Sequence, residues 1–452
     1  MMSHSIARRI RSHCAAIALM VAFSSHAWGA PPQFDPPELV GSGAGKHRLN
    51  RHGSGSLAFD ATGTLHLVWW EGGFATLASQ PSFVYYSQRG PSSPWIPAEL
   101  VDAASISGSD RIGGRQPSMV LDDSGAATIV WHDHRHSSGL LGWIDNIEIY
   151  AIRRLPAGGF SPEIRLTTTA SGNGGDNGYS PRIAARPGAS GPWPLSVAWY
   201  DFHFNGGVSD LFVATSDASG LFDPAATMAS RRLTDATQRG NTPAFTMVDI
   251  GVDADGNRHL VWMTGSTSGG PIYYARAPQG QAAFDVGPIL VSTGQADFQD
   301  PPRIAVNPAS GEVIILTSDA SAGASSDLWL YRLPPSGLVF DAPAMIAANG
   351  RQWGGSGIHD PATGDLHVVW VDERSGRRPW YGRLPAGSAS ITDDGPVVAD
   401  GRNWARPTLA LGPQGRMALA IEDDIDSTSG AVYVALTPAP PTAANPHWAL
   451  FE

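Results

Sequence analysis

GTLHLVW at 63–69, GAATIVW at 125–131 and GDLHVVW at 364–370 share one pattern: a glycine opens a short apolar run that a tryptophan closes. The pattern recurs as GNRHLVW at 256–262 and, with other closing residues, as GEVIILT at 311–317 and GRMALAI at 415–421. A seventh copy, GPWPLSVAW at 191–199, is two residues longer. Seven copies within 452 residues indicate a repeated fold.

Each copy lies in a unit with three further strand-like segments. A short apolar segment and a tight turn precede the glycine, as in SLAFD before Gly63. An aromatic-rich strand follows, as FVYYSQR at 83–89, IEIYAIR at 147–153, DLFVATS at 210–216, PIYYARA at 271–277, DLWLYRL at 327–333, PWYGRL at 379–384 and AVYVAL at 431–436. A fourth strand comes next, as in AELVDA at 98–103 and RRLTDA at 231–236.

This organisation predicts an all-β fold, a seven-bladed β-propeller of four-stranded blades over residues 38–435. The seventh unit lacks a fourth strand, and PELVGSG at 37–43 has its character, so we expect the N-terminal strand to close the ring. As an alternative, residues 447–451 could supply that strand. Residues 28–37 form a lead and 436–452 a Pro-rich tail.

Composition supports this fold class and excludes several functions. The 52 glycines and 36 prolines favour short strands joined by turns over long helices. A formal charge of −11 argues against a nucleic-acid partner. Lys46 is the only lysine, and it lies in no phosphate-loop or Schiff-base context, so the sequence gives those chemistries little support.

The N-terminus has the pattern of an export signal. Residues 1–27 carry three arginines, an apolar run of about ten residues and small residues at Ser25 and Ala27, which predicts a signal peptide. No later segment approaches the roughly 20 apolar residues needed to span a bilayer. We therefore expect a secreted or periplasmic monomer, and no disulfide, because Cys14 is the only cysteine.

TSDASGLF at 215–222 resembles the Asp-box turn of the sialidase superfamily, in which a serine and an aspartate precede a glycine and an aromatic residue. RLPAGGF at 154–160 and RLPPSGLVF at 332–340 keep the glycine and the aromatic residue but lose the aspartate. The chain thus resembles a sialidase-like propeller with degenerate boxes and seven blades rather than six. No residue is carried over as catalytic, because the sialidase set of three arginines, a tyrosine–glutamate pair and an acidic residue cannot be placed.

An acidic residue follows the tryptophan position by two residues in six of the seven units. The set is Glu71, Asp133, Asp201, Asp319, Asp372 and Asp423, with Thr264 in the remaining unit. A residue repeated around the ring is better explained as a structural carboxylate, since a reacting substrate is asymmetric. We expect Asp133 and Asp372 to pair with the arginine two residues further on.

Departures from the repeat identify the candidate site. WHDHRHSSGLLGWID at 131–145 places histidines at alternating positions, and histidine suits both proton transfer and metal binding. The candidate catalytic residues are His132, Asp133, His134, Tyr179, Asp201 and His203. No spacing here is typical of a metal site, so we assign no metal ligands and expect no required cofactor, leaving a divalent metal open.

Arginines and aromatic residues precede the first strands on the same face. Arginine forks bind carboxylates and flat rings suit sugars, so this combination indicates an acidic glycan. The candidate ligand-binding residues are Arg51, Glu71, Arg111, Arg115, Trp353, Arg402 and Trp404.

Two functions from different classes follow. The first is an exported sialidase-like propeller that recognises and cleaves an extracellular, acidic carbohydrate. The second is a non-catalytic binding or scaffold propeller whose acidic ring is structural. Among enzymes, a polysaccharide lyase is the alternative to a hydrolase, because some secreted lyases resemble seven-bladed propellers and use histidine, tyrosine and arginine on one face.

Overall fold

A computed structural model gives the architecture of the chain. It describes residues 31–42, 46–50, 55–72, 82–103, 113–136, 147–167, 178–186, 194–202, 209–234, 245–264, 270–296, 300–319, 326–347, 350–398, 400–424 and 430–438. The predicted signal peptide and residues 447–451 lie outside these ranges. No helix in the described ranges has the length and apolar character needed to cross a membrane.

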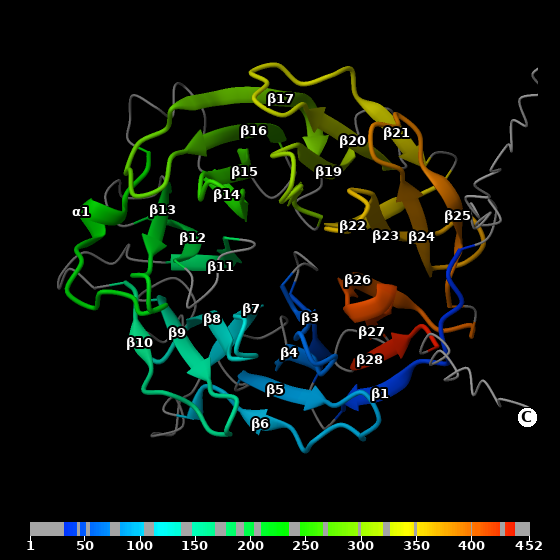
Figure 1. Ribbon diagram of the computed structural model, residues 1–452, viewed down its shortest axis with the longest axis horizontal. Coiled ribbons are helices and arrows are strands. Elements are labelled where there is room, and N and C mark those ends of the chain that lie inside the picture. Colours follow the sequence, from blue (N-terminus) through cyan, green and yellow to red (C-terminus); the bar gives the residue numbers. More distant parts are fainter. Residues whose placement is uncertain are drawn as a thin grey trace, which may run out of the picture.

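The described strands form seven blades around a central axis (Figure 1). Blade 1 contains β2 (His47–Arg48), β3 (Leu57–Phe59), β4 (Leu65–Glu71), β5 (Phe83–Arg89) and β6 (Glu99–Leu100). Blade 2 contains β7 (Gly114–Leu121), β8 (Ala127–Asp133), β9 (Glu148–Arg154) and β10 (Ile164–Arg165). Blade 3 contains β11 (Gly178–Ala185), β12 (Leu195–Asp201), β13 (Asp210–Thr215) and the helix α1 (Met228–Arg231).

The remaining four blades follow in chain order. Blade 4 contains β14 (Phe245–Val252), β15 (Arg258–Thr264), β16 (Gly270–Ala277) and β17 (Val286–Ala296). Blade 5 contains β18 (Arg303–Val306), β19 (Val313–Asp319), β20 (Asp327–Leu333) and β21 (Ala344–Ala347). Blade 6 contains β22 (Gln352–His359), β23 (Leu366–Asp372), β24 (Arg378–Leu384) and β25 (Thr392–Pro396). Blade 7 contains β26 (Trp404–Leu411), the 3-10 turn η2 (Pro413–Gly415), β27 (Met417–Asp423), β28 (Ala431–Leu436) and β1 (Glu38–Gly41).

The predicted seven-bladed propeller is confirmed, and blade 3 differs from the expected four-stranded pattern. In blade 3 the expected fourth strand at 231–236 is reduced to an isolated bridge between Phe212 and Arg232. The helix α1 occupies the chain just before it, capped by the Thr227 side chain, which accepts a hydrogen bond from Ser230 N. In blade 7 the outer strand is β1, which pairs antiparallel with β28.

The core consists of apolar clusters between neighbouring blades. One cluster joins Trp70 of blade 1 to Trp131 of blade 2, and another joins Leu67 of blade 1 to Val434 of blade 7. The tryptophans that close the second strands are 0–1% exposed, which confirms their prediction as core residues. Each blade therefore buries both faces against its neighbours, and the hydrophobic effect acts around the whole ring.

The repeated glycines form the turns between first and second strands. Gly63, Gly125, Gly256, Gly311 and Gly364 have φ between 74° and 83°, a conformation that strains other residues. The residue that opens the turn accepts hydrogen bonds within it: Asp60 Oδ1 accepts from Thr62 N at 2.9 Å and from Thr64 N at 2.8 Å. The repeated glycine in the sequence thus marks the position at which each turn needs a positive φ.

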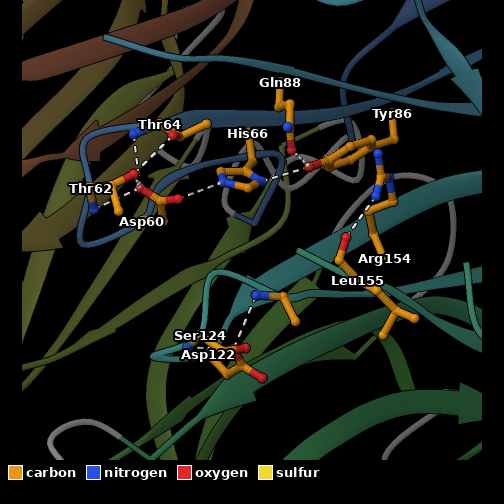
Figure 2. A network of polar contacts seen from close by, with 11 residues as sticks. Asp60, Thr62, Thr64, His66, Tyr86, Gln88, Asp122, Ser124, Arg154 and Leu155 are labelled. Carbon is orange, nitrogen blue, oxygen red and sulfur yellow. Dashed lines mark hydrogen bonds and ion pairs between the residues drawn. The ribbon is translucent and has the colours of Figure 1, made fainter. Parts of the chain in front are cut away.

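Three blades add a buried histidine and tyrosine to this turn. In blade 1, His66 Nδ1 lies 2.7 Å from Tyr86 Oη and His66 Nε2 lies 3.5 Å from Asp60 Oδ2, as Figure 2 shows. His259 bridges Tyr274 and Asp253 in the same way at 2.8 and 3.1 Å. In the third case, the ring of His367 contacts the hydroxyl of Tyr381. Recurrence in three blades indicates a structural role.

Five inner strands carry a bulge near their first residues. At each bulge one residue has a φ between 48° and 70°, and the pairing register shifts there. These residues are Gln116, Ser180, Met247, Gly354 and Arg406. In each strand the bulge separates the first two paired residues from the regular pairing that follows.

Ring closure by β1 can be tested with a matched pair of variants. Val40 packs against the apolar cluster between blades 7 and 1, whereas Leu39 on the same strand is 48% exposed. We expect Val40→Asp to lower the free energy of unfolding by about 1–3 kcal/mol, because it buries a carboxylate against apolar side chains. Leu39→Asp should change it by less than about 0.5 kcal/mol. Urea denaturation measures both, and equal effects would contradict the packing role of β1.

Candidate functional site

The second strands of the blades end at one face of the propeller, and five of the predicted catalytic residues lie there on blades 2 and 3: His132, Asp133, His134, Tyr179 and Asp201. His132 is the last residue but one of β8, which ends at Asp133. The centroid of its ring lies 5.4 Å from that of His134 and 5.9 Å from that of Tyr179 on β11. Ser180 N donates to His132 Nδ1 at 3.2 Å. The neutral ring therefore carries its hydrogen on Nε2.

Two arginines lie next to these histidines. Arg115 pairs directly with His132 in the β7–β8 ladder, and its guanidinium carbon lies 5.7 Å from the centre of the Trp70 ring. The guanidinium carbon of Arg48 lies 5.8 Å from the same ring. We call Arg48, Arg115, His132, His134 and Tyr179 the histidine–arginine cluster.

The polar atoms of this cluster are buried and only partly satisfied. Both ring nitrogens of His134, which is 5% exposed, have no hydrogen-bond partner in the described part of the chain. Arg115 Nε donates to Ser82 Oγ at 3.1 Å, but the buried Arg115 Nη2 donates to no described group. A buried polar group without a partner is costly, so these atoms are available to a ligand.

Burial also sets the charge states in the cluster. Burial, assisted by the positive charge of Arg115, lowers the pKa of His134 to about 3, so this ring is neutral at pH 7. Burial and the neighbouring Arg48 lower the pKa of Arg115 to about 10, which leaves it positively charged. The pKa of Tyr179 is raised, mainly by burial, so its hydroxyl keeps its proton. The cluster thus combines cations with a neutral imidazole and a phenol.

The acidic residues that the sequence analysis placed beside these histidines hold the fold together. Asp133 is fully buried and accepts hydrogen bonds from Trp131 Nε1 at 2.9 Å and from Arg135 N at 2.8 Å. It also forms an ion pair with Arg135 at 2.7 Å. Asp372 and Arg374 repeat the pairing in blade 6 at 2.6 Å, as predicted. Asp201 is 2% exposed at the end of β12.

The third histidine of the alternating series departs from the other two. His136 Nε2 lies 2.8 Å from Tyr150 Oη, and its ring stacks on that tyrosine instead of facing His132. Within the described ranges no group of three histidine, cysteine, aspartate or glutamate side chains could hold a metal ion.

The predicted ligand-binding residues are dispersed. Arg115 lies in the histidine–arginine cluster, whereas Glu71 accepts a hydrogen bond from the Tyr85 hydroxyl at 3.0 Å in blade 1. Trp353 donates to Glu373 at 3.1 Å, and Arg402 lies over the ring of Tyr433 at 4.4 Å. Arg51, Arg111 and His203 lie outside the described residues.

The sequence-based hypothesis that the ring of Trp404 binds a sugar is wrong, because the ring is buried. Its ring is 0% exposed and packs between blades 6 and 7, and its Nε1 donates to Asp400 Oδ1 at 2.9 Å. It occupies the start of β26, where the inner strand enters the core, so its ring face cannot reach a ligand. Sequence reasoning also missed Arg48, which lies in β2 of blade 1, two residues after the single lysine.

Comparison with known proteins gives structural matches alone, since neither a family profile nor a curated protein matches the sequence. An ulvan lyase of a polysaccharide lyase family aligns over 90% of this chain and 94% of its own, with a TM-score of 0.55 and 11% identity. The chain shares the propeller fold of this enzyme. The sialidase of Trypanosoma rangeli aligns over 72% of this chain and 55% of its own, at 10% identity and a TM-score of 0.47.

A further match is the NanB sialidase from Streptococcus pneumoniae. It aligns over 89% of this chain and 70% of its own, with a TM-score of 0.46 and 10% identity. At 11% identity, the ulvan lyase match supports the propeller fold of this chain and nothing beyond the fold.

Asp102 is a titratable carboxyl next to the cluster, where it joins blades 1 and 2. Its oxygens accept from Val84 N at 3.0 Å and from Gly114 N at 2.8 Å. Burial, with a contribution from the negative charge of Asp133, raises its pKa to about 7. This pKa lies above the value of about 3.9 in the unfolded chain. The contribution of Asp102 to the free energy of unfolding is therefore complete below pH 4 and is lost as the pH rises through 7.

We expect Asp102→Asn to remove this pH dependence. Near pH 4 the free energy of unfolding of the variant should resemble that of the wild type. At pH 8 it should exceed that of the wild type, by on the order of 4 kcal/mol at most. Urea unfolding at the two pH values measures the difference. Asp217→Asn is the control, because hydrogen bonds from Ser219 and Leu221 lower the pKa of that exposed carboxyl. An unchanged pH profile in Asp102→Asn would contradict the assignment.

Proposed function

We propose that the chain is an exported enzyme that binds an acidic polysaccharide at the histidine–arginine cluster and cleaves it by β-elimination. The observation that carries the proposal is the unpaired buried polar surface of Arg115 and His134. A uronate carboxylate would accept a hydrogen bond from Arg115 Nη2. This would give the buried guanidinium the acceptor that the described residues do not provide. Export, to a secreted or periplasmic location, rests on the pattern of residues 1–27.

The cluster contains the groups that an elimination requires. Positive charge from Arg115 stabilises the negative charge that develops on the carboxylate when the neighbouring C5–H bond is broken. His134 is neutral at pH 7, and the arrival of a carboxylate raises its pKa, which makes it a stronger base in the complex. The Tyr179 hydroxyl keeps its proton and is suited to a general acid.

The proposed step balances without water. His134 takes the C5 proton, and the electron pair of that bond forms a C4=C5 double bond. The bond between C4 and the glycosidic oxygen breaks, and that oxygen takes the proton of the Tyr179 hydroxyl. Proton exchange with solvent returns His134 to its neutral form and Tyr179 to its phenol form, so the products are one unsaturated uronate end and one free hydroxyl end.

Elimination fits the described residues better than hydrolysis. A hydrolase of the two-carboxylate type needs an acid and a base free to exchange protons with substrate and water. Asp133 is bound by Trp131 and Arg135, and Asp201 is buried at the end of β12. The fold resembles that of an ulvan lyase whose structure contains a bound glucuronate–sulfated rhamnose unit. This resemblance supports elimination over hydrolysis.

Variants of the cluster test the mechanism. We expect His134→Gln and Tyr179→Phe to lower kcat on a glucuronate-containing polysaccharide by about 10²–10⁴-fold, because each removes a proton-transfer group. Arg115→Gln should raise KM as well as lower kcat. The measurement is the ultraviolet absorbance of the unsaturated product, with ulvan among the substrates.

The matched control is His136→Gln, since His136 contacts Tyr150 rather than the cluster. Mass spectrometry of the products must show an unchanged total mass. Fragments that have gained water would establish hydrolysis instead. If no substrate is cleaved but Arg115→Gln weakens binding of the polysaccharide, the chain is the binding propeller of the second hypothesis.

A further inference from the structure

Two buried arginines line one pocket between blades 3 and 4. The helix α1, which contributes one of them, lies at the outer edge of the ring (Figure 1). Arg231 ends α1 and is 5% exposed, and Arg258 begins β15 and is 4% exposed. Since β15 begins at the face of the glycine turns and ends at the opposite face, this pocket is separate from the histidine–arginine cluster. Its volume of about 200 Å³ admits a small ion and a few waters of roughly 30 Å³ each.

The two guanidinium groups are held by neutral oxygens. Arg258 Nη2 donates to Pro278 O at 2.8 Å and to Gln281 O, while Nη1 donates to Thr215 Oγ1 at 3.4 Å. Arg231 donates through Nη1 to Leu166 O and through Nη2 to Asp223 O. In the described part of the chain neither arginine has a carboxylate oxygen within 4.0 Å.

This arrangement leaves positive charge uncompensated in the pocket. Arg258 Nε is buried and has no hydrogen-bond partner among the described residues. Burial lowers the pKa of both arginines, and the one nearby acidic group that acts on Arg231 is the exposed Asp223. The Asp223 carboxylate is itself engaged at a turn, where Oδ1 accepts from Ala225 N at 2.8 Å.

An unpaired buried cation is strongly destabilising, and burying two in one pocket is unexpected in a chain with a net charge of −11. Other buried arginines in the described blades pair with a carboxylate: Arg182 pairs with Asp249 at 3.0 Å and Arg154 pairs with Glu99 at 2.8 Å. We propose that the pocket between Arg231 and Arg258 binds a small oxyanion such as sulfate, either free or carried on a sugar. The ligand would accept from the guanidinium edges that face the pocket.

Calorimetric titration of the full chain with inorganic sulfate, at constant ionic strength, tests the proposal. We expect one saturable site and a rise in melting temperature that sodium chloride does not reproduce. Ala226→Glu places a carboxylate in the pocket without altering either arginine, so it should weaken sulfate binding at least tenfold while preserving or raising the melting temperature. Arg89→Gln, a change of an arginine on blade 1, should bind sulfate like the wild type.

Two outcomes would overturn the proposal: no saturable binding to the wild-type chain, or equal binding to Ala226→Glu and the wild type. If Ala226→Glu does not fold, Gln281→Glu introduces the same charge from the opposite wall. A parallel titration with a sulfated disaccharide distinguishes the source. Tighter binding than inorganic sulfate identifies a sugar-borne group, and equal or weaker binding identifies the free ion.

Discussion

Packing of one blade against the next is the interaction on which the rest of this structure depends. A single four-stranded blade cannot bury two apolar faces by itself, so each blade is stable only between two neighbours. The ring must therefore close, and a chain with its one cysteine at position 14 has no disulfide to close it. Antiparallel pairing of β1 with β28 joins the two ends of the propeller through backbone hydrogen bonds and the apolar cluster behind them.

Because this packing repeats, the fold could be predicted closely from the sequence. The predicted third strands at 83–89 and 327–333 coincide with β5 and β20. Their aromatic residues alternate along the strand, which indicates the side of the strand that packs against a neighbouring blade. The fourth strand predicted for blade 3 at 231–236 was not confirmed. Its residues resemble those of the other blades, but Thr227 caps a helical turn just before it. Local capping there outweighs strand propensity.

The candidate site was predicted in part. Alternating histidines correctly placed His132 and His134 together, because residues two apart in a strand share one side. Trp404 was wrong as a platform, since a tryptophan before a first strand gives no sign of whether it enters the core. The histidines of the turn networks were visible in the repeats as the H of GTLHLVW and GNRHLVW, but their tyrosine partners come from the next strand and need the register.

The bulges of the inner strands have a consequence for how such a propeller can change. A bulge absorbs one residue, so the alternation of side chains above it is independent of the alternation below it. Residues that precede a bulge, such as Arg115 before Gln116 and Tyr179 before Ser180, can therefore be exchanged without moving the rest of the ladder into a new register. The regular ladders below the bulges form a fixed frame, and new specificity can arise at these five inner strands, one blade at a time, at little cost to folding.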